Sequence, residues 1–144
     1  MRNEIICGAS YEVMRDMMPE SVDLIVTSPP YDAIRDYKGY PKLDLNGIGL
    51  QAFRVLKDGG VMAVVINDGT KDFQKSLTSF RMVTYYVDNI GFKLFETVIY
   101  ERDARPGAWW AQRFKVNHEY VFIFFKGKKP KYFNKLPLYI PTKT

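Results

Sequence analysis

The chain has 144 residues, of which 47% are hydrophobic and 26% charged, and its formal net charge is +5. These values are those of a single globular domain, and the positive charge suits a polyanionic partner. The single cysteine, Cys7, excludes an internal disulfide, and the lack of a long apolar run excludes a membrane span, so we expect a cytoplasmic protein.

Short apolar runs and amphipathic segments alternate through the first half of the chain. We predict a strand at Glu4–Gly8 that buries Cys7, and a helix that Ser10 caps and that runs to about Met18. A continuous apolar run predicts a buried strand at Val22–Thr27. After a long polar loop, Leu45–Leu56 is predicted to be a helix that ends before Gly59 and Gly60.

The second half continues this alternation. We predict a strand at Val61–Ile66, a helix at Thr78–Ile90, strands at Phe92–Glu101 and His118–Phe125, and an irregular loop at Ala104–Lys115. The order predicts an α/β fold with a mainly parallel sheet and an antiparallel edge hairpin. Residues 1–126 are expected to form the folded unit, and residues 127–144 a basic, aromatic tail or linker.

The strand Val22–Thr27 runs directly into Ser28, Pro29, Pro30 and Tyr31. The prolines have no backbone N–H and end the strand pairing, which leaves Ser28 and Tyr31 at the carboxyl end of a buried strand, where ligands bind in α/β sheets. A hydroxyl and carbonyls with no neighbouring donors can accept both hydrogens of an exocyclic amine, while Tyr31 stacks on its ring. Such a site makes an amino nitrogen a better nucleophile.

Thr27–Tyr31 resembles the catalytic motif of DNA amino-methyltransferases, which transfer a methyl group from S-adenosylmethionine to cytosine N4 or adenine N6. Other segments resemble motifs of this family in the same order, namely Ile5–Gly8, Pro19–Asp23, Tyr31–Tyr37, Phe53–Gly60 and Asn117–Lys126. The resemblance implies a Rossmann-like methyltransferase sheet, with residues 1–126 as its catalytic subdomain.

The resemblance also implies residue roles. Tyr31 stacks on a base rotated out of the duplex, and Ser28 and the carbonyl of Pro29 accept its amino hydrogens. Contacts to S-adenosylmethionine fall on Ala9, Ser10 and Pro30, although the family usually has Asp where this chain has Ala9. Because the Ser-Pro-Pro-Tyr form is more usual for cytosine N4, we predict cytosine in preference to adenine.

One element that the resemblance implies does not occur in these 144 residues: a strand leading into an FxGxG loop, which holds the methionine part of the cofactor. In the family this strand lies between those that resemble Glu4–Gly8 and Val22–Thr27. We therefore expect an incomplete sheet with two unpaired edges. Either the two strands close up directly, or self-association or a complementary chain fills the gap.

We predict DNA contacts from two loops and the tail, at Arg35, Tyr37, Trp109, Trp110, Arg113, Lys128 and Lys129. Structural alternatives stay open for each group. Arg35 can pair with Asp36 at the surface, the two indoles can cover a core edge or a subunit interface, and the lysines can be merely solvated.

His118 and Glu119 resemble the acid–base pair of a hydrolase, but no Ser or Cys motif accompanies them, so we expect a structural role. One His and one Cys do not supply the usual ligands of a metal site, so none is expected. A rival function is a non-catalytic DNA-binding subunit or remnant that complements a partner chain. Methylation of RNA or of a protein amide is a third, although the protein-glutamine enzymes have Asn at the position of Ser28.

Overall fold

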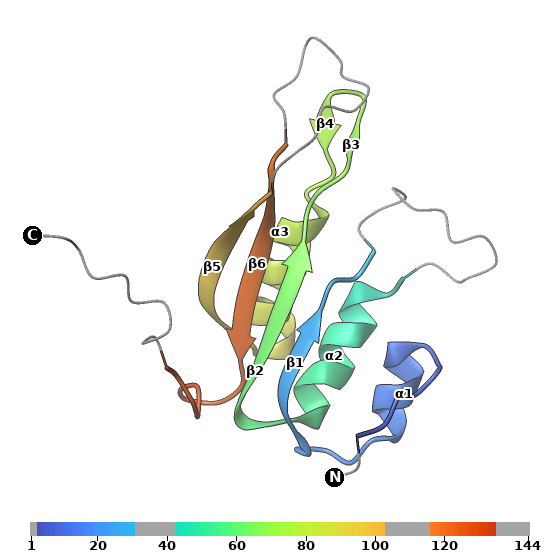
Figure 1. The fold of residues 1–144 in the computed structure, drawn as a ribbon, viewed down its shortest axis with the longest axis vertical. Helices are drawn as coiled ribbons and strands as arrows, with labels where there is room; N and C mark the ends of the chain where they lie inside the picture. The colour runs from blue at the N-terminus through green and yellow to red at the C-terminus, as the bar shows by residue number, and fades with distance from the viewer. Residues whose placement is uncertain (1–2, 31–42, 103–115, 135–144) are drawn as a thin grey trace, which may run out of the picture.

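The computed structural model describes residues 3–30, 43–102 and 116–134, drawn in colour in Figure 1. The elements, in chain order, are α1 (Ser10–Asp16), β1 (Val22–Thr27), α2 (Leu45–Val55), β2 (Leu56–Ile66), β3 (Thr70–Lys71), β4 (Gln74–Lys75), α3 (Thr78–Tyr85), the π-helical η2 (Tyr86–Ile90), β5 (Lys93–Glu101) and β6 (His118–Phe125). No helix in this part of the chain is long and apolar enough to cross a membrane.

The main sheet has the strand order β1-β2-β6-β5. β1 is parallel to β2, whereas β6 is antiparallel to both of its neighbours, β2 and β5. Three strands therefore run in one direction and β6 in the other, and β5 and β6 form the antiparallel edge hairpin predicted from the sequence. Beyond the carboxyl end of β2, β3 and β4 form a separate small hairpin (Figure 1). The predicted α/β class is confirmed.

The predicted first strand, Glu4–Gly8, is wrong. These residues form no strand, the side chain of Ile5 is fully exposed at 101%, and Cys7, expected in the core, is exposed. A strand forms only beside a neighbour that satisfies its backbone hydrogen bonds, and within the described residues β1 pairs with β2 alone. Direct closure of the two strands is therefore also wrong, and no described residue pairs with the second edge of β1.

A single core cluster lies between the sheet and the helices. The face of the sheet that points into it, here called the covered face, carries Met62, Val64, Ile66, Phe122 and Phe124. The helices contribute Ala52 from α2, Met82 from α3 and Tyr86 from η2, and Met14 of α1 packs against the cluster. All the described helical segments therefore contribute to the packing against this one face of the sheet.

Tyr86 is the polar anchor of this core. Its ring fits against α2 because residue 49 is glycine: a Cβ atom there would collide with Cε1 of the ring. Its hydroxyl donates a hydrogen bond of 2.7 Å to the carbonyl of Leu45 at the start of α2. Burial, and secondarily the charge of Asp44, raise the pKa of the Tyr86 phenol well above its usual value.

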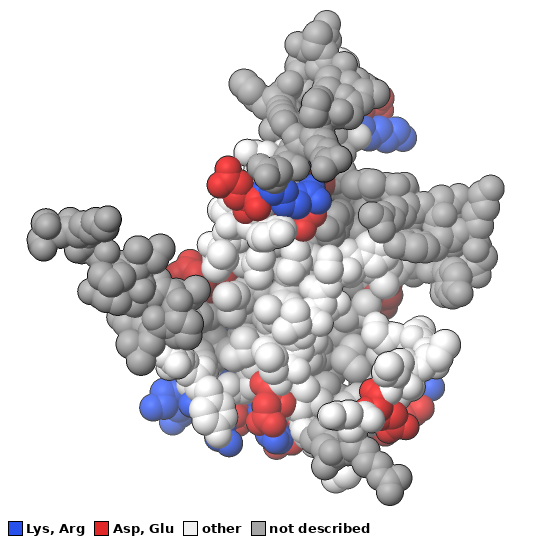
Figure 2. Space-filling view, in the orientation of Figure 1, with Lys and Arg blue, Asp and Glu red and all other residues white. Residues whose placement is uncertain are grey.

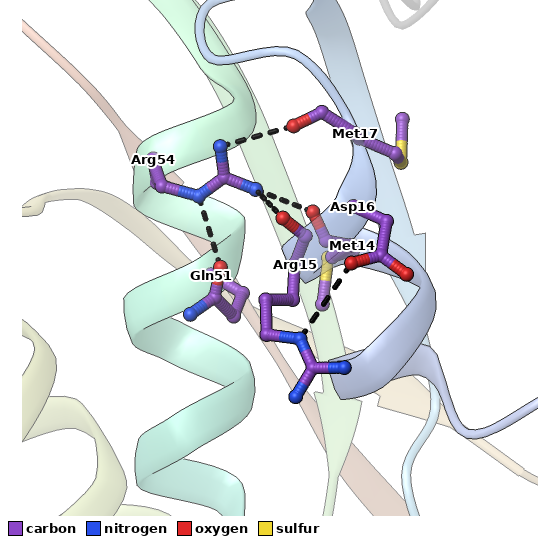
Figure 3. A network of polar contacts seen from close by, with 6 residues as sticks. All are labelled: Met14, Arg15, Asp16, Met17, Gln51 and Arg54. Atoms are coloured by element: carbon purple, nitrogen blue, oxygen red, sulfur yellow. Dashed lines mark hydrogen bonds and ion pairs between the residues drawn. The ribbon is translucent and has the colours of Figure 1, made fainter.

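Arg54, in the last turn of α2, fixes α1 (Figure 3). Its guanidinium donates to the carbonyls of Met14, Arg15 and Met17 at 2.5, 2.9 and 3.0 Å, and to the side chain of Gln51 at 2.9 Å. The carbonyls at the end of a helix have no partner within it, so one side chain of α2 satisfies the end of α1. α1 itself is shorter than predicted, and Ala9 rather than Ser10 is its N-cap residue, without a side-chain hydrogen bond.

Candidate active site at the carboxyl end of the sheet

The Ser28–Pro30 segment directly follows β1, as predicted. The register that pairs Thr27 with Val64 sets this segment beside the last residues of β2. Pro29 is buried, whereas Ser28 and Pro30 are exposed. The segment is thus anchored through its middle residue, and the Ser28 side chain faces solvent at the sheet edge where ligands bind in α/β proteins.

Two buried polar residues that sequence reasoning did not select lie at the adjacent end of β2. The side-chain amide of Asn67 donates to the carbonyl of His118 at 2.6 Å, and its oxygen accepts from the backbone N–H of Asp68 at 2.7 Å. Asp68 accepts from the backbone N–H and the hydroxyl of Ser79 at 2.8 and 2.6 Å. These bonds join the carboxyl end of β2 to the starts of β6 and α3, and we call this group of contacts the rim. The signal for it was present: Asn-Asp-Gly directly after a buried strand.

His118 and Glu119 lie at this same end. Glu119 is buried, with 7% of the residue exposed. Its carboxylate forms an ion pair of 2.9 Å with the guanidinium of Arg102, which directly follows β5. The His118 ring packs edge-on against Tyr120. These contacts agree with the structural role expected for the pair. The described residues contain no cluster of His, Cys, Asp and Glu that could hold a metal ion.

Ala9 and Ser10, the predicted cofactor contacts, lie at the start of α1 and are both exposed. The ring of Tyr11 in the first turn lies against Gly47, near the start of α2. Because α2 ends where β2 begins, its start lies toward the carboxyl end of the sheet. Ala9 and Ser10 are therefore on the same side of the molecule as Ser28 and Pro30.

Lys128 and Lys129 lie at the opposite end of the sheet. The tail follows β6, which runs against β1, and the backbone N–H of Lys131 bonds to the carbonyl of Gly59 near the start of β2 at 2.9 Å. β1 has six residues, and at about 3.3 Å per residue its length separates the two lysines from Ser28 by about 20 Å. The structure does not bring the two lysines together with the motif, and their contact with DNA stays a prediction.

The remaining predicted site residues, Tyr31, Arg35, Tyr37, Trp109, Trp110 and Arg113, lie outside the described residues. Both segments that contain them are joined to the carboxyl end of the sheet. Residues 31–42 follow Pro30, and residues 103–115 separate the end of β5 from the start of β6.

Several known proteins with similar sequences or structures are described as methyltransferases. The model of the N6/N4 DNA methylase family matches residues 22–144. The orphan methyltransferase M.BamHII of Bacillus amyloliquefaciens is 41% identical over 118 residues, which are 81% of this chain. The PvuII DNA methyltransferase, described as cytosine-N4-specific, superimposes with a TM-score of 0.68 over 86% of this chain at 25% identity.

A protein of Thermus thermophilus solved with S-adenosyl-L-methionine has the same fold, with a TM-score of 0.64 over 93% of this chain at 20% identity. The chain spans 42% of the length of M.BamHII, 49% of the PvuII enzyme and 61% of the Thermus protein. The matched region includes the Ser28–Pro30 segment and every strand of the main sheet. The chain belongs to the N6/N4 DNA methylase family.

Proposed function

We propose that the chain is the catalytic half of a site-specific DNA methyltransferase that uses S-adenosylmethionine to methylate an exocyclic amine, cytosine N4 in preference to adenine N6. The observation that carries this proposal is the position of Ser28, Pro29 and Pro30, anchored at the carboxyl end of β1 in a chain of the N6/N4 family. The likeness to the cytosine-N4-specific PvuII enzyme supports the preferred base.

In this proposal the chain holds and activates the target amine. The hydroxyl of Ser28 and the carbonyl of Pro29 accept the two amino hydrogens, while Tyr31 stacks on the base after it leaves the duplex. Accepting those hydrogens draws the nitrogen lone pair out of conjugation with the ring. The amine becomes the attacking nucleophile, and no covalent bond to the protein forms.

S-adenosylmethionine supplies the transferred methyl group when it is bound. Ala9, Ser10 and Pro30 are its proposed contacts on this chain. Among these three residues only Ser10 has a polar side chain, so they supply a small part of what a charged, polar cofactor requires. This donor set fits one wall of a cofactor site and supports a second polypeptide, either a further copy or a complementary chain, as the source of the rest.

DNA is the proposed substrate, contacted near the motif by Arg35, Tyr37, Trp109, Trp110 and Arg113. Lys128 and Lys129, at the far end of the sheet, would reach only backbone phosphates away from the target base. In this scheme residues 1–126 are the catalytic subdomain and residues 127–144 a basic tail, of which the described part lies against the start of β2. The proposed location is the cytoplasm.

The second candidate function is a non-catalytic DNA-binding subunit that complements a partner chain. One observation favours it: Ala9 stands where the family usually has Asp, so this position offers no polar side chain to the cofactor.

The test is to incubate the purified chain with labelled S-adenosylmethionine and mixed-sequence DNA, digest the DNA and identify the methylated nucleoside. We expect label in N4-methylcytosine, and Tyr31→Ala should abolish it because the base loses its stacking partner. Tyr132→Ala is the matched control, since Tyr132 is 76% exposed and lies in the tail at the other end of the sheet.

Label in N6-methyladenine would show that adenine rather than cytosine is the target base, and it would still support the proposal that the chain is a methyltransferase. Full activity of the Tyr31→Ala variant would refute the stacking role. A folded chain that transfers no label alone, or with its partner, would favour the non-catalytic subunit.

A further inference from the structure

The small hairpin of β3 and β4 lies at the same edge of the main sheet as the Ser28–Pro30 segment. β1 and β2 are parallel neighbours, so their carboxyl ends lie side by side. Thr70, the first residue of β3, follows Ile66, the last residue of β2, by four residues, a length of chain that spans at most about 14 Å. The hairpin is therefore a close neighbour of the candidate active site.

The turn at the tip of this hairpin has an unusual sequence for its backbone. Lys71 pairs with Gln74, so Asp72 and Phe73 form a two-residue loop, and their φ angles are +50° and +63°. A loop with positive φ at both positions favours Asn-Gly or Asp-Gly, because glycine adopts this conformation without steric cost. Asp72 fits the pattern. Phe73 occupies the position where glycine is expected, and a bulky residue with positive φ is a conformational outlier.

Burial does not account for a phenylalanine at this position, since Phe73 is 63% exposed. Backbone outliers persist only where the surrounding structure holds them, and they cluster at sites that bind ligands. The turn presents an aromatic ring to solvent at the edge of the sheet that carries the candidate active site. We therefore looked for what holds the hairpin and what its other side chains can bind.

Hydrogen bonds to the rim hold the hairpin in place. Its strands have two residues each, too few to be stable alone. The backbone N–H of Ser76 donates to the carbonyl of Gly69 at 3.1 Å and closes the base of the hairpin. The ammonium of Lys75 donates to the carbonyl of Asp68 at 3.1 Å, and the hydroxyl of Ser76 donates to the Asp68 carboxylate at 3.2 Å. Since Asp68 is buried, these bonds fix the hairpin relative to the sheet.

Basic side chains accompany the exposed ring. Lys71 and Lys75 belong to the hairpin, and the guanidinium of Arg81 on α3 donates to a carbonyl at its base at 3.1 Å. Of the acidic groups nearby, Asp72 is exposed, whereas the carboxylate of Asp68 is bound within the rim. Figure 2 shows basic atoms beside acidic ones where Figure 1 draws β3 and β4. An exposed aromatic ring with neighbouring cations suits a nucleic acid, through base stacking and phosphate contacts.

We propose that the β3–β4 hairpin contacts DNA beside the target base. The ring of Phe73 stacks in the gap that the base leaves when it rotates out of the duplex, and the ammonium of Lys71 contacts a backbone phosphate. This inference rests on the proposed function and names a positioning residue for it. Rotation of a base costs stacking and pairing, and an apolar side chain that fills the gap favours the rotated state. A ring that the rim already holds in place loses little freedom on binding.

A duplex with an abasic site tests the inference without knowledge of the target sequence. One mixed-sequence duplex is prepared in two forms, intact and with a single central abasic site, and binding by the purified chain is measured by fluorescence anisotropy. The abasic form already contains the gap and offers no base to the Ser28–Pro30 segment. We expect the chain to bind it about tenfold more tightly than the intact form, because no base has to leave the stack.

Phe73→Gly should remove this preference and leave the hairpin intact, since a φ of +63° favours glycine. Its thermal unfolding midpoint should therefore not fall below that of the wild type. Phe73→Trp should keep the preference, because an indole also stacks. Phe133→Ala is the matched control, since Phe133 is 68% exposed but lies in the tail at the other end of the sheet.

Lys71→Ala should weaken binding of both forms equally and lower the slope of log affinity against log salt by about one, as expected when one phosphate contact is lost. Unchanged binding by this variant would overturn the phosphate contact.

Equal affinity of the wild type for the two duplexes, a preference that withstands Phe73→Gly, or a Phe73→Gly variant that unfolds would each overturn the stacking role. A chain that prefers the abasic form but transfers no methyl group to intact DNA would refute the proposed function and leave the hairpin contact standing. A chain that methylates DNA but binds both duplexes equally would refute the hairpin contact alone.

Discussion

The two faces of the main sheet have similar sequences and different surroundings. The face opposite the covered face, here called the open face, carries Leu24 and Val26 of β1, Val61, Ala63 and Val65 of β2, and Val121 and Ile123 of β6. On β6, Phe124 is fully buried among α2, η2 and β2, whereas Ile123, its neighbour on the open face, is only partly buried. On β1, Ile25 packs against the core while Val26 is 68% exposed. An apolar strand sequence indicates that both faces of the sheet are to be covered. It does not tell which polypeptide segments cover them. The described residues supply one such layer.

The largest expected effect comes from changing one residue on each face. Phe124→Ala should destabilise the chain by about 3–5 kcal/mol, since it removes a large side chain from a closed core and leaves a cavity. Ile123→Ala should cost less, about 2 kcal/mol in the isolated chain, because this side chain is only partly buried and keeps some of its surface in water. Urea titration followed by circular dichroism measures both.

Equal losses for the two variants would break the comparison, since they would mean that the open face is already packed in the isolated chain. A loss for Ile123→Ala well below that for Phe124→Ala would sharpen the comparison, since it would show that the open face is the less packed of the two.

A second prediction concerns the outer layer of the covered face, where Arg54 holds α1 on α2. Arg54→Met keeps the length of the side chain but leaves the carbonyls of Met14, Arg15 and Met17 without their donor. We expect a loss of about 2 kcal/mol, typical of hydrogen bonds to a charged group, and faster hydrogen exchange within α1. Arg54→Lys should recover only part of it, because an ammonium lacks the planar fork that reaches three acceptors.

Exchange in α1 that is unchanged by Arg54→Met would mean that side-chain packing, rather than this network, fixes the helix. The consequence for the site is direct, because the same helix positions Ala9 and Ser10.

Where one residue type dictates the backbone, the sequence predicted the structure closely. β1 ends at Thr27, before two prolines that cannot pair, and the helical segment after Thr78 ends at Gly91, which has a φ of +100° that favours glycine. β6 has its predicted bounds because an unbroken apolar and aromatic run buries one side. Each of these boundaries is set by a few adjacent residues, so a short sequence segment is enough to predict it.

Where the outcome depends on a distant neighbour, the prediction failed. Glu4–Gly8 has the composition of a strand, but no strand among the described residues pairs with it, and Cys7 is exposed. The rim of Asn67 and Asp68 was missed for a related reason: their partners, His118 and Ser79, are brought there only by the fold. The position of Ser28 directly after β1 was predicted correctly because the strand and the prolines that end it lie in one contiguous segment, and the role of Ser28 in the reaction stays a prediction.

The smallest expected effect tests the polar anchor of the covered face, Tyr86. At neutral pH, Tyr86→Phe should cost about 1 kcal/mol, the usual value for a lost hydrogen bond, here the one to the carbonyl of Leu45. Because burial raises the pKa of this phenol above its unfolded value of about 10, folding favours the protonated form. Its contribution is therefore complete below about pH 10 and is lost as the pH rises further. Above about pH 10, the free energy of unfolding of the wild type should fall as the pH rises. The fall should be smaller for Tyr86→Phe, which lacks this phenol. Since no open-face residue titrates, Val26→Thr should keep the wild-type slope, and an equal change of slope in that variant would show that the alkaline transition does not arise from Tyr86.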